Sequence, residues 1–221
     1  MNIMTVLLIS SISFFAFIFI IAQFVGKDEH YDSCFSSNDY NINEYYKSLT
    51  HTTTDCITSA IKAISSEIKI NKKIVKADLY AFSFFYVRLI CIQGCRDKDI
   101  ANELTTDMLK AFTEETKYTI PMDFATFISI LNNRISVFEE LYMIADDREK
   151  IVDSLLDEMG ILLAHDVLYG KYVPFSLTLP MPVLNFEYQF TLDLTIKAFF
   201  VKYVGQIDNL ISKIRKTYGL E

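Results

Sequence analysis

The sequence predicts a mainly α-helical protein, with an N-terminal transmembrane helix followed by a bundle of about five to six helices and one late β-hairpin. Residues 3–25 form an uncharged apolar run, and most of the later apolar side chains recur at helical spacing. The 221 residues include only six Gly and four Pro, which favours long helices over many short strands. We therefore expect a transmembrane anchor at 1–26, a polar juxtamembrane linker at 27–53, and a helical domain at 54–221 with a hairpin near 173–190.

The composition indicates a folded body and disfavours one class of partner. The chain is 51% hydrophobic and contains 18 Phe and 13 Tyr, whereas disordered chains are poor in aromatic residues. Its formal net charge is −7, and a general nucleic-acid binder needs a basic face to displace counterions from phosphates. We therefore expect no nucleic-acid partner.

The N-terminal apolar run has the length of a membrane-spanning helix. Residues 3–25 would extend roughly 35 Å as a helix, and a bilayer core is about 30 Å thick. A cleaved signal peptide is the first alternative and a buried core helix the second. No Lys or Arg precedes the run, and its exit, AQFVGKDEH, lacks a small-x-small cleavage site. We expect a single-pass membrane protein that contacts lipid through residues 3–25.

Two observations favour a body on the cytoplasmic side. Lys27 follows the apolar run, and no basic side chain precedes it. The four cysteines are irregularly spaced, which is not typical of a disulfide framework.

The segment from Ile74 to Cys95 is apolar on nearly every side, which is typical of a central core helix. Asp78 and Arg88 interrupt it, leaving too short an uncharged run to cross a membrane. We expect Arg88 to pair with an acidic side chain of a neighbouring helix. Gly94 is a plausible stop signal for this helix.

Helical stripes of apolar residues also predict the other helices of the bundle. They occur at 57–68, 100–112, 124–142, 151–163 and 196–218. Asp99 is a candidate N-cap for the second of these, and Gly170 is placed to end the fourth.

The spacing changes from helical to alternating near the predicted hairpin. Apolar residues alternate with polar ones in VPFSLTL and again in LNFEYQF, which is a hairpin pattern with one apolar face. We consider that face a candidate partner surface, formed by Phe175, Leu177, Phe186, Tyr188 and Phe190. The alternative is that these side chains only cover the core of the bundle.

The sequence contains no recognisable catalytic, metal-binding or cofactor-binding motif. Cys91 and Cys95 are four residues apart on the predicted central helix, and Cys56 could join them. Core packing is our interpretation for these cysteines, with a metal site or a disulfide as alternatives. His165 is expected to be a structural residue near a helix end.

These observations favour a membrane-anchored helical interaction protein, an accessory or regulatory subunit without catalytic activity, that binds a protein partner or itself. A membrane-acting effector or immunity-type protein is the alternative. An enzyme with an unrecognised site is a lesser one.

Overall fold

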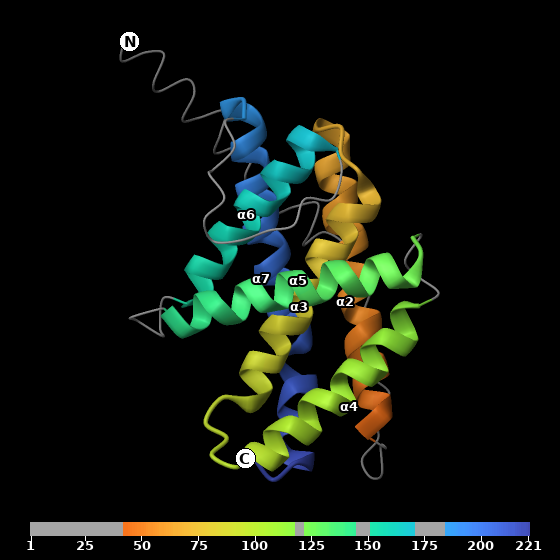
Figure 1. Cartoon of the computed structure of the whole chain (residues 1–221), viewed down its shortest axis with the longest axis vertical. Helices are drawn as coiled ribbons and strands as arrows, with labels where there is room; N and C mark the ends of the chain where they lie inside the picture. Colours follow the sequence, from red (N-terminus) through yellow and green to blue (C-terminus); the bar gives the residue numbers. More distant parts are fainter. Residues whose placement is uncertain (1–41, 118–121, 145–150, 171–183) are drawn as a thin grey trace.

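A computed structural model describes residues 42–117, 122–144, 151–170 and 184–221 of the protein. The elements of these residues are six α-helices (Figure 1). They are α2 (Ile42–Glu67), α3 (Lys72–Ile92), α4 (Lys98–Thr116), α5 (Phe124–Ile144), α6 (Ile151–Tyr169) and α7 (Phe186–Thr217). The prediction of a helical bundle is confirmed.

Helix α3 lies at the centre of the bundle. It packs against α2, α4, α5, α6 and α7. Its residues 77–87 are all buried, and Tyr80, Ala81 and Phe82 have no exposed surface. The aromatic side chains of α3 contact rings from several other helices, including Phe112, Phe138 and Phe200. The predicted central helix is therefore confirmed.

Helix α2 begins at Ile42, within the stretch that the sequence assigned to the polar linker. Thr50 and Thr53 are buried although they are polar, because their hydroxyls donate to backbone carbonyls four residues earlier, at 2.9 and 2.7 Å. Thr53 Oγ1 also lies 2.9 Å from the Tyr203 hydroxyl of α7. The folded body thus starts earlier than the polarity of this stretch suggests.

Local capping groups set several helix ends. The Asn71 side chain accepts a hydrogen bond from the Lys73 amide at the start of α3. At the start of α4 the cap is Asp97, and Asp99, the residue expected in that role, lies in the first turn. Gly170 follows α6 with a φ of 62°, a conformation that glycine adopts without strain.

Two ion pairs join α3 to α5. Asp78 Oδ1 accepts a hydrogen bond from Arg134 Nε at 2.7 Å, and both side chains are almost fully buried, at 0% and 1% exposure. Arg88 pairs with Glu139 near the surface and also donates to Thr105 of α4. The expected partner for Arg88 on a neighbouring helix is therefore confirmed.

Hydrogen bonds join the C-terminal end of α7 to the C-terminal end of α3. Arg215 Nη1 donates to the carbonyls of Ile90 and Gln93, each at 2.9 Å. Arg215 Nη2 donates to the Leu220 carbonyl at 3.2 Å. Carbonyls at a helix end lack intrahelical partners and carry partial negative charge, so a guanidinium satisfies them well.

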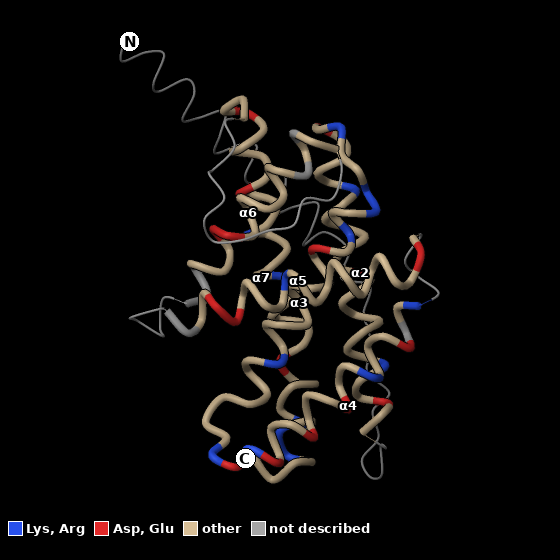
Figure 2. Tube along the Cα trace, in the orientation of Figure 1, with Lys and Arg blue, Asp and Glu red and all other residues tan. Residues whose placement is uncertain are grey.

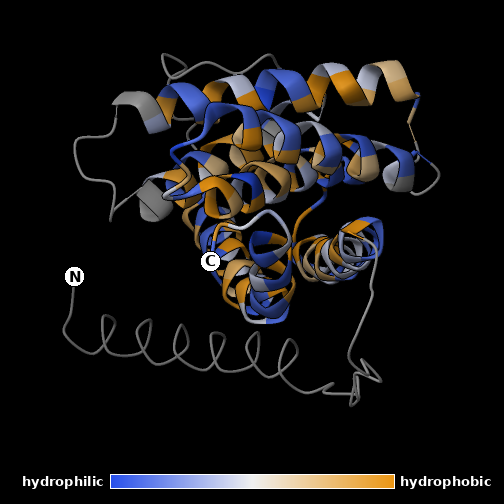
Figure 3. Cartoon of the chain, turned by 90° about the horizontal axis from the view of Figure 1, so that it is seen from below, coloured by the Kyte–Doolittle hydropathy of each residue, from blue (hydrophilic) through white to orange (hydrophobic). Residues whose placement is uncertain are grey.

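Hydrophobic residues gather where the helices face one another, as the view along the bundle shows (Figure 3). None of the helices within the described residues is long and apolar enough to span a bilayer. The predicted anchor at residues 3–25 lies outside the described residues.

We predict that Asp78→Asn lowers the free energy of unfolding by about 3–5 kcal/mol, because it removes the negative charge that lies 2.7 Å from the buried Arg134 guanidinium. Chemical denaturation measures this effect. The free energy of unfolding should fall less in the double variant Asp78→Leu/Arg134→Met than in the single variant, since apolar groups replace both charges. Glu139→Gln, which breaks the more exposed pair, is the matched control and should cost at most about 1 kcal/mol. A loss of under about 1 kcal/mol in Asp78→Asn would contradict this account.

Candidate interaction surface

Aromatic side chains at the start of α7 are exposed to solvent. Phe186 is 70% exposed and Tyr188 is 40% exposed. Phe190 is half-buried, and its ring stacks on Phe186 with centroids 6.0 Å apart. We call these three residues the α7 aromatic patch. They are part of the predicted partner surface, whereas Phe175 and Leu177 lie outside the described residues.

The second arm of the predicted hairpin is wrong, because Phe186–Phe190 is the start of a helix. The Asn185 side chain accepts a hydrogen bond from the Glu187 amide at 3.1 Å and so caps α7. Residues four apart fit both an alternating and a helical pattern, which is why Phe186 and Phe190 misled the sequence analysis. The first arm, Val173–Leu179, lies outside the described residues.

Hydrogen bonds between α2 and α7 show that these two helices run antiparallel. The Tyr46 hydroxyl donates to the Tyr218 hydroxyl at 3.1 Å, and Cys56 Sγ donates to Gln206 Oε1 at 2.9 Å. Ile42 therefore lies at the C-terminal end of α7, and the α7 aromatic patch lies at the other end. Helix α2, with 26 residues, is about 39 Å long, so Ile42 lies far from the patch.

Helix α6 supports the beginning of α7 through a close contact at Gly160. A Cβ atom on Gly160 would lie 3.1 Å from Asp193 Oδ1 and 3.9 Å from Ile196 Cδ1. Asp193 Oδ1 also accepts a hydrogen bond from Gln189 Nε2 at 3.0 Å. Burial raises the pKa of the Asp193 carboxyl above its usual value. The α7 aromatic patch therefore belongs to a helix that packs closely against α6, and the side chain of Asp193 in its next turns is held by a hydrogen bond.

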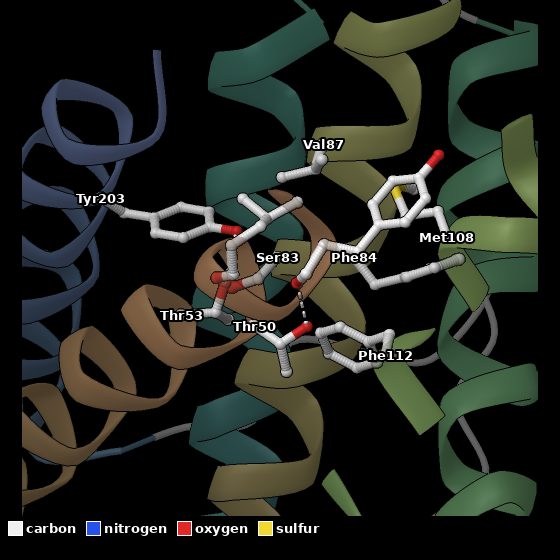
Figure 4. Close-up of a pocket in the computed structure, with 10 residues that line it drawn as sticks. Thr50, Thr53, Ser83, Phe84, Val87, Met108, Phe112 and Tyr203 are labelled. Atoms are coloured by element: carbon white, nitrogen blue, oxygen red, sulfur yellow. Dashed lines mark hydrogen bonds between the residues drawn. The ribbon is translucent and has the colours of Figure 1, made fainter. Parts of the chain in front are cut away.

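A small pocket lies inside the bundle, between α2, α3, α4 and α7 (Figure 4). Thr50, Thr53, Ser83 and Tyr203 are among the residues that line it, together with apolar residues such as Phe112, and nearly all of its surface is apolar. Its volume of about 10 Å³ is near the minimum that holds one water molecule. This pocket therefore cannot hold a small-molecule substrate.

Two of the three described cysteines, Cys56 and Cys91, are buried in the core. Burial raises the pKa of Cys56 to about 11 and that of Cys91 to about 12, so both stay protonated at neutral pH. Cys95 is partly exposed and donates to the Asp97 carbonyl. Within the described residues no group of three or more His, Cys, Asp or Glu side chains could hold a metal ion. Core packing of Cys56 and Cys91 fits their burial, and Cys95 lies just beyond the end of α3.

His165 is buried near the end of α6, where its ring stacks on Tyr169 with centroids 5.7 Å apart. Tyr169 itself is 52% exposed. The sequence expectation of a structural histidine agrees with this packing, and the exposed Tyr169 ring is a surface feature that the sequence analysis missed.

Comparisons with known proteins give no significant match: no family model, no curated protein and no solved structure matches this chain. The function proposed below therefore rests on the residues and geometry of the chain itself.

We predict that Asp193→Asn raises the melting temperature at about pH 7 and has little effect at about pH 4. The raised pKa means that the folded state binds a proton more tightly than the unfolded state, so stability from this group is present at low pH and is lost as the pH rises through the folded pKa. The variant removes the charge and keeps an oxygen that can accept from Gln189. Asp208→Asn, at an exposed position of the same helix, is the control. An equal effect of Asp193→Asn at both pH values would contradict the prediction.

Proposed function

We propose that this protein is a membrane-anchored helical interaction protein, an accessory or regulatory subunit that binds a protein partner without catalysing a reaction. The exposed α7 aromatic patch carries this proposal. Phe186 and Tyr188 contribute little to the core at their exposures of 70% and 40%, so their apolar surface is available to another molecule. Aromatic side chains are enriched in the energetically dominant parts of protein interfaces.

The patch has the rigidity that an interface benefits from. Asn185 caps α7, and Gly160 lets α6 pack closely behind the next turns. A side chain on a fixed helix loses less conformational entropy on binding than one on a mobile loop. The α7 aromatic patch is therefore suited to protein recognition.

The membrane part of the proposal rests on the sequence. Residues 3–25 are uncharged and long enough to cross a bilayer. Lys27 on the C-terminal side favours a body in the cytoplasm. Because α2 and α7 are antiparallel, a partner bound at the α7 aromatic patch would meet the end of the body that is remote from Ile42.

We predict that Phe186→Ser/Tyr188→Ser reduces the retained partner by more than tenfold without lowering the melting temperature. The reason is that truncating an aromatic residue at the centre of an interface typically costs about 2 kcal/mol or more. The measurement is affinity purification of the tagged full chain from alkali-washed membranes in mild detergent, with the retained proteins quantified by mass spectrometry.

Val201→Ser is the matched control, because Val201 is 73% exposed on the same helix and lies outside the patch. It should retain the partner at the wild-type level. Equal retention by the double variant would contradict the proposed interface. Unfolding of the double variant would show that the rings serve the core instead. Loss of the wild-type chain in the alkaline wash would contradict the anchor.

A further inference from the structure

The connection between α2 and α3 is strongly basic in an otherwise acidic protein. Residues 62–76 contain five Lys and a single acidic residue, Glu67, while the whole chain has a net charge of −7. We call Lys69, Lys72 and Lys73 the lysine turn. Lys and Arg segments gather at this end of α2 and α3 (Figure 2).

The three side chains of the lysine turn are exposed, and none of them forms an ion pair within the described residues. Lys72 and Lys73 stand in the first turn of α3, which contains no acidic residue. A helix N-terminus carries partial positive charge, so two cations at this position oppose the stability of α3. Their concentrated charge is thus available for an anionic group from another molecule.

The lysine turn lies at the same end of the bundle as the exposed aromatic side chains. Asn71 Nδ2 donates to the Gly170 carbonyl at 3.1 Å, which joins the start of α3 to the end of α6 and to the exposed Tyr169. Helix α7 begins at this end as well (Figure 1). Cations and exposed aromatic rings therefore share the end of the body that is remote from Ile42.

We infer that this end of the bundle docks an acidic segment of a protein partner, whose carboxylates meet the lysine turn and whose apolar side chains meet the exposed aromatic rings. The inference rests on the proposed function and adds the chemistry of the partner. A protein segment suits this site because one acidic segment can present both carboxylates and apolar side chains, which complement the lysine turn and the exposed aromatic rings beside it. The net charge of the chain disfavours nucleic acid.

The test uses the full chain in a non-ionic detergent and a fluorescent peptide of about 15 residues, mostly Glu with Leu at every fourth position. Fluorescence anisotropy gives the Kd at about 50 mM and about 300 mM NaCl, concentrations between which screening of charge pairs increases strongly. The variants are Lys69→Glu/Lys72→Glu/Lys73→Glu and the matched control Lys47→Glu/Lys98→Glu/Lys216→Glu. The control changes three exposed lysines at the opposite end by the same total charge.

We expect wild-type protein and the control to bind the peptide within about twofold of each other, and the lysine-turn variant to bind at least tenfold more weakly. Binding should weaken at the higher salt concentration. The lysine-turn variant should melt no lower than wild type, because Glu in the first turn of α3 suits the helix dipole. Lost binding would then report on recognition and not on folding.

Equal binding by the two triple variants, or no binding by wild type, would overturn the inference. Tighter lysine-dependent binding to vesicles of phosphatidylcholine with phosphatidylserine, or to single-stranded DNA, would overturn the protein partner in favour of a lipid surface or nucleic acid. These outcomes differ from those of the Phe186→Ser/Tyr188→Ser experiment, which tests the proposed function itself.

Discussion

The burial of the middle of α3, residues 77–87, is the constraint on which the rest of the structure depends. These residues are shielded from water by the neighbouring helices, so the neighbouring helices must supply partners for their polar side chains. Arg134 of α5 pairs with Asp78, and Arg215 of α7 satisfies the last carbonyls of α3. These pairings fix the positions of α5 and α7 around the central helix. Removing the Asp78 carboxylate would take the charge of its ion-pair partner away from a buried guanidinium, which costs more than the pair itself contributes.

The antiparallel packing of α2 and α7 gives the body two different ends. One end contains Ile42 and the Arg215 contacts. The other presents the α7 aromatic patch, the exposed Tyr169 and the lysine turn. Polar contacts along the shared face, such as Thr53 with Tyr203, keep the two helices in register. A surface held on a packed frame is pre-organised for binding, which lowers the entropic cost of forming a complex.

The sequence was sufficient where one physical effect dominated. The all-round apolar character of Ile74–Cys95 predicted the central helix, and the cost of an unpaired charge predicted an acidic partner for Arg88. It was insufficient where two patterns coincide. Phe186 and Phe190 fit both a strand and a helix, and the cap at Asn185 decides between them. The Thr-rich stretch before Thr54 was predicted to be a linker because its side chains are polar. In the structure, the hydroxyls of Thr50 and Thr53 donate to backbone carbonyls of their own helix, which allows these side chains to be buried.

Long-range partners could not be predicted from local patterns. Arg134 lies far from Asp78 in the chain, and the hydrogen bonds of Arg215 reach the end of α3, which is also distant in the sequence. For the candidate surface, the sequence analysis named the residues of the α7 aromatic patch but predicted a strand for them, whereas they lie in a helix. It missed Tyr169 and the lysine turn, since only the fold brings the ends of α2, α6 and α7 together.

The central claim is that a protein partner occupies the end of the body that carries the α7 aromatic patch. Photo-crosslinking in intact membranes tests it most directly, with a photoreactive phenylalanine at position 188 and, as a comparison, at position 201 of the same helix. The account predicts a discrete protein adduct from position 188 and none from position 201. Crosslinks to lipid alone at position 188, or equal adducts from both positions, would contradict it.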